Sequence, residues 1–208
     1  MKQILCFGDS NTWGLVAGTM KRHSWNERWT GILQERLMNQ DIRVIEEGLC
    51  GRTTVFEDER RGGRRGVDVF PVLLETHTPD LTVIMLGTND CKAAYGATAE
   101  EIGQGIELLL DQLDRYAPES RTLLVSPIHL GSQVWKDEYD PEFNTESVRI
   151  SRELKRVYGK IAGDHRIEFM AASDYACPSA DDMEHLDKNG HLALADAMYR
   201  KINGLLMA

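Results

Sequence analysis

The feature that most constrains the fold is a regular alternation of short apolar runs with longer segments of helical period. Five runs rich in valine, isoleucine and leucine have the length of buried strands, at residues 3–7, 42–46, 81–86, 122–125 and 166–170. Segments with apolar residues at helical spacing lie between and after them, at residues 27–38 and 69–76, and from Thr98, from Thr145 and from about Gly190. Thr98 and Glu101 form the signature of a capping box at one of these helix starts.

This order of elements predicts a single α/β domain over residues 1–208. Strands that alternate with helices form a parallel sheet with helices packed on both faces. We therefore expect a three-layer α/β/α sandwich around a five-stranded parallel sheet. A chain of 208 residues is long enough to bury one core of ordinary size.

Charge and composition narrow the function classes. The formal net charge of −9 disfavours nucleic acid as a partner, because phosphate binding needs a basic surface. No stretch is apolar for long enough to span a membrane, and the first residues lack the long apolar region of a signal peptide, which predicts a cytoplasmic protein without a membrane partner. The four cysteines form no C-x-x-C pair, so reduced structural thiols are expected.

Polar and glycine residues follow each predicted strand. In an open parallel sheet, ligands bind beyond the carboxyl ends of the strands, so the loops that begin there converge on one edge. These loops contain residues 8–11, 48–54, 87–90 and 127–129, and the stretch after the last strand reaches residues 182–185. The sequence therefore predicts one functional site at this edge.

The residues at this edge suit nucleophilic catalysis by serine. A serine hydroxyl needs a base to accept its proton, and histidine held by a carboxylate is the usual base. Ser10 is the candidate nucleophile, His185 the base, and Asp182, three residues earlier, the carboxylate. The N–H groups of Ser10 and Gly51 and the side-chain amide of Asn89 are the candidate donors to a developing oxyanion.

Each of these motifs also has an ordinary structural interpretation. Gly8-Asp9-Ser10 is compatible with a turn that caps a helix, and Gly87-Thr88-Asn89-Asp90 with a second turn. His185 alone is compatible with a surface histidine, and His185 with His191 and nearby carboxylates with a metal site, although such sites usually need three or more ligands. The joint occurrence of the motifs at successive strand ends favours serine catalysis without a metal.

The motifs together resemble a known family. Gly8-Asp9-Ser10, Gly51, Gly87-x-Asn89-Asp90 and Asp182-x-x-His185 are similar to the four sequence blocks of the GDSL, or SGNH, hydrolases. Further segments, at residues 5–14, 28–33, 44–49, 52–54 and 84–90, resemble the bacterial arylesterases that also act as acyltransferases and perhydrolases. One departure is Glu46-Glu47-Gly48, where many family members carry an asparagine.

The resemblance implies a flavodoxin-like SGNH hydrolase fold, a serine esterase mechanism, no cofactor, and homo-oligomers in which loops of one subunit shape the pocket of another. We expect hydrolysis of small short-chain acetyl or aryl esters through an acyl-enzyme on Ser10, with acyltransferase or perhydrolase side activity. The alternatives are a carbohydrate acetyl esterase, a lysophospholipase or thioesterase, a binding module without activity, and a metal-dependent hydrolase. Activity should fall below the pKa of His185, near 6.5 if that pKa is unperturbed.

Four further residues are candidate substrate contacts. Asn11 and Trp13 follow the nucleophile directly, and His129 and Trp135 belong to the region after the fourth strand. The two tryptophans suit the wall of a small apolar pocket, although core packing is an equal alternative. Two long polar loops, residues 52–66 and 129–144, are candidates for the surroundings of the site, since loops of this length in a compact domain are often functional.

Overall fold

Five parallel strands form one sheet at the centre of the molecule, as the alternating pattern predicts. The structure is a computed structural model that describes residues 1–207. The strands are β1 (Lys2–Gly8), β2 (Ile42–Gly48), β3 (Leu81–Met85), β4 (Arg121–Ser126) and β5 (Glu168–Ala171), each within two residues of its predicted limits. Their order across the sheet is β2-β1-β3-β4-β5, the flavodoxin-like order.

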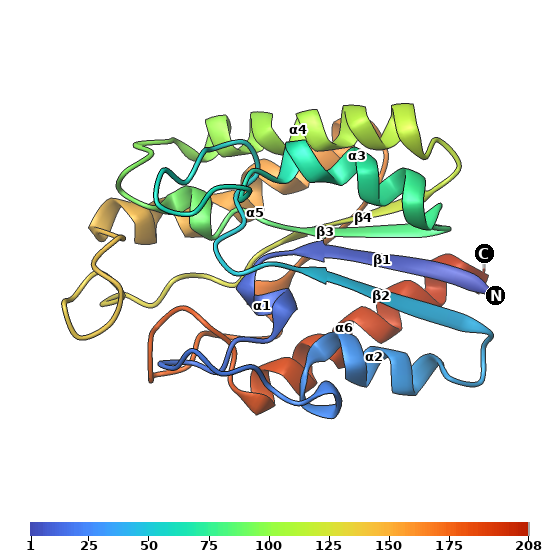
Figure 1. The fold of residues 1–208 in the computed structure, drawn as a ribbon, viewed down its shortest axis with the longest axis horizontal. Coiled ribbons are helices and arrows are strands. Elements are labelled where there is room, and N and C mark those ends of the chain that lie inside the picture. The colour runs from blue at the N-terminus through green and yellow to red at the C-terminus, as the bar shows by residue number, and fades with distance from the viewer. Residues whose placement is uncertain (208) are drawn as a thin grey trace.

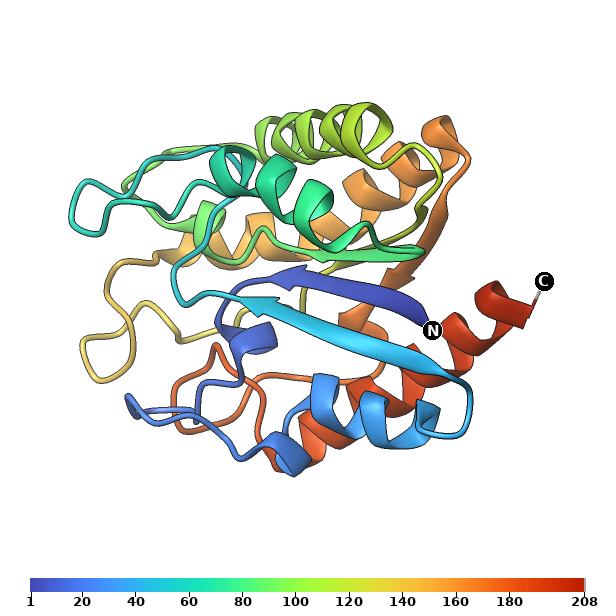
Figure 2. The same cartoon turned by 45° about the vertical axis from the view of Figure 1, so that its right-hand side comes forward.

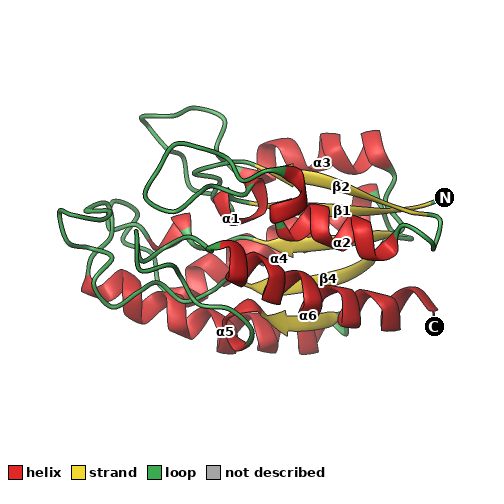
Figure 3. Cartoon of the chain, turned by 90° about the horizontal axis from the view of Figure 1, so that it is seen from below, coloured by secondary structure: helices red, strands yellow, loops and turns green. Residues whose placement is uncertain are grey.

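Helices cover both faces of the sheet, which confirms the three-layer architecture (Figure 1). One layer contains α2 (Trp29–Leu37) and α6 (Lys188–Met207), which pack against each other; Figure 3 shows them across the lower face. The other contains α3 (Gly66–His77), α4 (Ala99–Tyr116) and α5 (Thr145–His165). Side chains of a buried parallel strand point to both layers in turn. In β1, Ile4 and Cys6 therefore join the core under α2 and α6, and Leu5 and Phe7 join the other core.

Helix α3 begins at Gly66, three residues before the predicted start. The backbone N–H groups of Gly66 and Val67 donate to the carbonyls of Thr53 and Thr54 at 2.9 and 3.1 Å. These long-range partners satisfy the first turn in place of a side-chain cap, and a local sequence pattern cannot reveal them.

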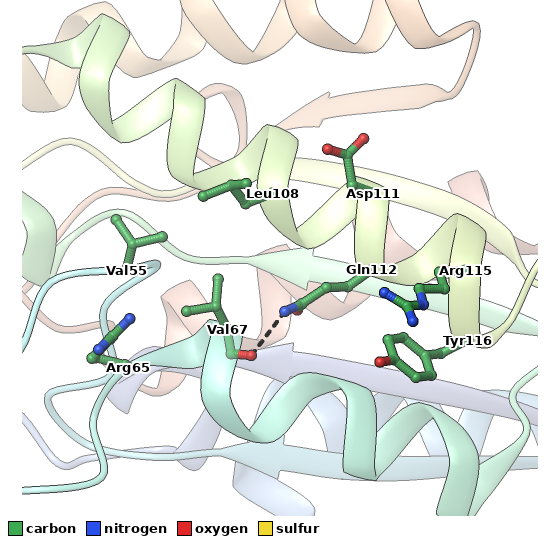
Figure 4. Close-up of a pocket in the computed structure, with 8 residues that line it drawn as sticks. All are labelled: Val55, Arg65, Val67, Leu108, Asp111, Gln112, Arg115 and Tyr116. Atoms are coloured by element: carbon green, nitrogen blue, oxygen red, sulfur yellow. Dashed lines mark hydrogen bonds between the residues drawn. The ribbon is translucent and has the colours of Figure 1, made fainter.

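Pro71 lies inside α3 and has no N–H to donate to the carbonyl of Val67, one turn earlier. The side-chain amide of Gln112 on α4 replaces that donor, at 2.9 Å from the Val67 oxygen. Figure 4 shows this bond inside a shallow hollow between the two helices. The proline is thus accommodated by a contact between neighbouring helices.

The single helix predicted over residues 27–38 is wrong in its first turn. A 3-10 turn covers Trp25–Glu27, and α2 begins at Trp29 after an extended residue, Arg28. The side chain of Arg28 is buried and donates to the Glu46 carboxylate at 3.0 Å and to the His23 carbonyl at 2.9 Å. These two bonds hold Arg28 outside the helix.

The capping box at Thr98 is confirmed: the N–H of Glu101 donates to Thr98 Oγ1, and the N–H of Thr98 donates to the Glu101 carboxylate.

The long loops gather beyond the carboxyl ends of the strands, as both Figure 1 and Figure 2 show. Within residues 1–207, no helix is both long and apolar enough to cross a membrane. The four cysteines are free thiols.

Candidate active site

Ser10 lies at the carboxyl end of β1, where the strand order changes direction between β2 and β3. It is the first residue of the short helix α1 (Ser10–Trp13). Asp9 caps this helix by accepting the Asn11 N–H at 2.9 Å. The turn packs tightly on the end of β2, because a Cβ atom on Gly48 would lie 2.2 Å from the backbone nitrogen of Trp13. A rigid turn therefore holds the Ser10 hydroxyl above the sheet edge.

The structure brings the three predicted residues of the triad together. His185 Nε2 lies 2.8 Å from Ser10 Oγ, and His185 Nδ1 lies 2.7 Å from Asp182 Oδ2. Ser10 is 3% exposed and His185 is 6% exposed, so both side chains are largely shielded from water. A buried hydroxyl, imidazole and carboxylate in this order have the geometry of a nucleophile, its base and an orienting group.

The carboxylate of Asp182 accepts four hydrogen bonds. Besides His185 Nδ1, its donors are the N–H groups of Gly18, Glu184 and His185, each at 2.9 Å. Burial alone would raise the pKa of Asp182, but the hydrogen bond and charge of His185 and the backbone donors outweigh burial and lower the pKa to about 2. Asp182 is therefore ionised at neutral pH and fixed in one orientation.

The backbone around His185 is held from several directions. Met183 adopts a left-handed conformation at φ 63°, and its carbonyl accepts the Gly131 N–H at 2.7 Å. The side chain of Asn11 joins the two flanks of the histidine: its oxygen accepts the Leu186 N–H at 3.0 Å, and its nitrogen donates to the Glu184 carbonyl at 3.4 Å. Both polar ends of Asn11 are thus engaged with protein backbone.

The three predicted oxyanion donors lie in the loops after three neighbouring strands: Gly51 after β2, Ser10 after β1 and Asn89 after β3. The N–H groups of Ser10 and Gly51 donate to no acceptor within residues 1–207. Gly51 has φ +82°, a left-handed conformation that favours glycine. Asn89 is 3% exposed and its amide nitrogen donates to the Arg52 carbonyl at 3.1 Å.

Two buried charged residues support these donors, and the motif search assigned neither of them a role. Arg52 is 4% exposed, donates to the Gly8 carbonyl at 2.9 Å, and lies with its guanidinium 4.3 Å from the centre of the Phe7 ring. Asp90 accepts the Thr54 N–H at 2.8 Å, and burial raises its pKa to about 6. Because these side chains tie the loops after β1, β2 and β3 together, they fix the positions of the donors.

Glu184 is a site residue that the sequence search missed. Its side chain is 8% exposed and its Oε1 lies 3.8 Å from His185 Nε2, on the side of the ring that faces Ser10. Burial raises the pKa of Glu184 to about 7. Burial alone would lower the pKa of His185, but the charges of Glu184 and Asp182 outweigh it and raise that pKa to about 9. The value of 6.5 applies to an unperturbed histidine, and the two carboxylates perturb His185.

The predicted substrate contacts lie in different surroundings. The Arg22 guanidinium covers one face of the Trp13 ring at 4.8 Å from the ring centre. Trp135 is 38% exposed, which excludes core packing, and its ring nitrogen donates to the Ser132 carbonyl at 3.2 Å. His129 is partly buried, and burial lowers its pKa, with smaller effects from Arg152 and Lys155 on α5.

One ion pair, between Arg60 and Glu142, links the two long loops. Glu142 pairs with Lys92 and, at 3.2 Å, with Arg60.

His191, a candidate metal ligand in the sequence, lies away from the triad. It is fully buried in contact with His23, and its Nδ1 accepts the Trp29 N–H at 3.4 Å. Within residues 1–207, no group of three or more His, Cys, Asp or Glu side chains could hold a metal ion. The hollow in Figure 4 contains none of the predicted site residues.

Known proteins share both the sequence pattern and the fold. An aryl esterase of M. smegmatis superposes with a TM-score of 0.90 and 32% identity, covering 99% of this chain and 100% of its own. A carbohydrate acetylesterase of Sinorhizobium meliloti gives the same TM-score and identity over 99% and 100% of the two chains. An arylesterase of Vibrio mimicus is 33% identical over 91 residues, which are 43% of this chain and only 38% of that relative. Residues 6–201 match the GDSL-like Lipase/Acylhydrolase family, to which this chain therefore belongs.

Proposed function

We propose that this protein is a carboxylic ester hydrolase that forms an acyl-enzyme on Ser10. The observation that carries the proposal is the continuous line of contacts from Asp182 through His185 to Ser10, at 2.7 and 2.8 Å. Family membership and the two esterase neighbours support the reaction class.

In the first half-reaction, Ser10 Oγ attacks the ester carbonyl while His185 Nε2 takes the hydroxyl proton. Asp182 keeps the other proton on Nδ1, which leaves the Nε2 lone pair free to act as base, and stabilises the charged imidazolium. The tetrahedral intermediate collapses when the bond to the alcohol oxygen breaks, and His185 gives its proton to that oxygen. The alcohol leaves, and the acyl group stays on Ser10.

The negative oxygen of the intermediate meets the N–H groups of Ser10 and Gly51 and the amide of Asn89. Fixed donors at such an oxygen require no rearrangement during the reaction, and each contributes roughly a hundred- to a thousand-fold to the rate. In the second half-reaction, His185 takes a proton from water as the water oxygen attacks the acyl carbonyl. The tetrahedral intermediate then collapses: its bond to Ser10 Oγ breaks, His185 gives the proton to that oxygen, and the carboxylic acid leaves.

The substrates that this proposal favours are small acetyl and aryl esters. One neighbour is named an aryl esterase and another a carbohydrate acetylesterase, which supports both alcohol classes. Transfer of the acyl group to an alcohol or a peroxide instead of water would follow the same steps with a different nucleophile. Such transfer requires a site dry enough to disfavour water.

The roles of the four further candidate residues are refined by their contacts. Asn11 acts as a positioning residue for the loop of His185, because both ends of its amide bind that loop. Trp13 and the exposed Trp135 stay candidates for the walls of the substrate site. A substrate contact by His129 stays a prediction, and so does the cytoplasmic location. The association into homo-oligomers is also a prediction, and light scattering of the purified protein would measure it.

The test is hydrolysis of p-nitrophenyl acetate by the wild type and by Ser10→Ala. Loss of the nucleophile should lower kcat by roughly 10⁴-fold or more. A fluorophosphonate should add its mass to the wild type and not to the variant. Undiminished turnover by Ser10→Ala would refute the assignment of the nucleophile.

A further inference from the structure

Glu184 has an environment that the proposed mechanism does not explain. Its side chain is buried, yet no lysine, arginine or hydrogen-bond donor within residues 1–207 pairs with its carboxyl group. Neither carboxyl oxygen is among the fully covered polar atoms, so both keep some contact with the space beside the site. His185 Nε2, at 3.8 Å, is a charged neighbour but lies beyond hydrogen-bond distance, so the carboxyl group makes no hydrogen bond of its own and can form one with a bound substrate.

The position of Glu184 relative to the reaction identifies the part of the substrate that it meets. His185 Nε2 must lie within hydrogen-bond distance of the alcohol oxygen, because it hands its proton to that oxygen. Glu184 Oε1 lies 3.8 Å from the same nitrogen. A substituent on the second carbon of the alcohol, one carbon beyond the carbon bonded to the ester oxygen, is therefore within reach of the Glu184 carboxyl group, whereas the acyl group lies on the other side of the ester oxygen.

The charges around Glu184 decide which substituent fits. His185 and Lys92 contribute positive charge, and Asp140 and Asp182 contribute negative charge. With burial, these neighbours bring the pKa of Glu184 to about 7, so both protonation states are populated near neutral pH. An ionised carboxylate accepts a hydrogen bond from a hydroxyl and a protonated one donates to it. A cationic substituent would need the ionised state, and an apolar substituent would leave the group unpaired in both.

We propose that Glu184 selects the alcohol half of the substrate. It favours esters whose leaving alcohol carries a hydroxyl on the carbon adjacent to the acylated one, as in polyol and sugar acetates, over esters of plain alcohols of the same length. This inference rests on the proposed function, because it needs His185 as the proton donor to the leaving group. It deepens that function by naming polyhydroxy alcohols as the leaving-group class.

The experiment compares glycerol 1-monoacetate with propyl acetate. Both release acetate from a three-carbon alcohol, and they differ in the two further hydroxyls. We expect the wild type to prefer the glycerol ester, and Glu184→Leu to lower the ratio of the two kcat/KM values by roughly 10- to 100-fold, the range for a hydrogen bond to a charged group. Glu184→Gln should retain part of the ratio, because an amide still bonds a hydroxyl. Glu119→Leu, at an exposed glutamate before β4, is the matched control and should keep the wild-type ratio.

The ratio separates substrate selection from other roles of Glu184. A role only through the charge of His185 would change both kcat/KM values by the same factor and leave the ratio intact, and that result would overturn the proposal. Equal use of the two esters by the wild type would overturn it as well. If Glu184→Leu does not fold, Glu184→Gln supplies the comparison. Two other results would instead mean that the proposed function itself is wrong: Ser10→Ala hydrolyses both esters, or the wild type hydrolyses neither of them.

Discussion

Replacing Asp182 with asparagine keeps the size of the side chain but gives one of its two polar atoms hydrogens to donate. In the native structure both carboxylate oxygens accept, Oδ1 from the N–H groups of Glu184 and His185 and Oδ2 from Gly18 N–H and His185 Nδ1–H. An asparagine oxygen can replace only one of these two acceptors. In either orientation, the amide NH₂ faces two donors.

The two orientations have different chemical costs. With NH₂ at the Oδ2 position, His185 Nδ1 must accept, so its proton moves to Nε2 and the ring can no longer take the Ser10 proton. With NH₂ at the Oδ1 position, two backbone N–H groups next to the base lose their partner. The first outcome lowers kcat by roughly 10⁴-fold, the effect of the wrong histidine tautomer. Two lost bonds to a charged acceptor cost about 3–6 kcal/mol, which lowers the Tm of a domain of this size by roughly 6–24 °C.

The assay is kcat for p-nitrophenyl acetate together with thermal unfolding of wild type, Asp182→Asn and Asp181→Asn. Asp181 is the exposed neighbour, and its side chain accepts a single hydrogen bond from Ser179 Oγ, at 3.2 Å. We expect Asp181→Asn to match the wild type in both measurements. A kcat of Asp182→Asn within tenfold of the wild type together with an unchanged Tm would refute the role given to this carboxylate, because each orientation of the amide predicts a loss in one of the two measurements.

Two further substitutions test the electrostatics and the oxyanion site. Glu184→Gln removes a negative charge beside His185 and should therefore lower the raised pKa of His185. Because histidine must be neutral to act as base, the acidic limb of the pH profile of kcat/KM for propyl acetate should shift toward lower pH. An acidic limb that stays in place would contradict the coupling between the two side chains. Asn89→Ala removes one oxyanion donor and should lower kcat by roughly 100- to 1000-fold with a smaller effect on KM. A change in KM alone would instead assign Asn89 to ground-state binding.

The sequence was sufficient for the fold and for the placement of the triad because both depend on regular patterns. The apolar runs mark strands that are buried on both faces, and parallel strands bring their following loops to one edge. Ser10 and Asn89 follow β1 and β3, the neighbouring strands at the point where the strand order reverses. The start of α3 was missed because its cap is the backbone of Thr53 and Thr54, which no local pattern encodes.

The same reasoning explains why Glu184 could not be found from sequence. Between Asp182 and His185, an acidic residue is as compatible with a solvated turn as with a buried site. What decides is the left-handed conformation of Met183, which a non-glycine residue adopts only when its surroundings enforce it. The loop is enforced here by the Gly131 N–H on the Met183 carbonyl and by Asp182 on the N–H of Glu184. Because the turn is fixed at both ends, the carboxyl group of the residue before the histidine is held beside His185 Nε2. Under the proposed role, the identity of this one residue sets both the alcohol preference and, through its charge, the pKa of His185.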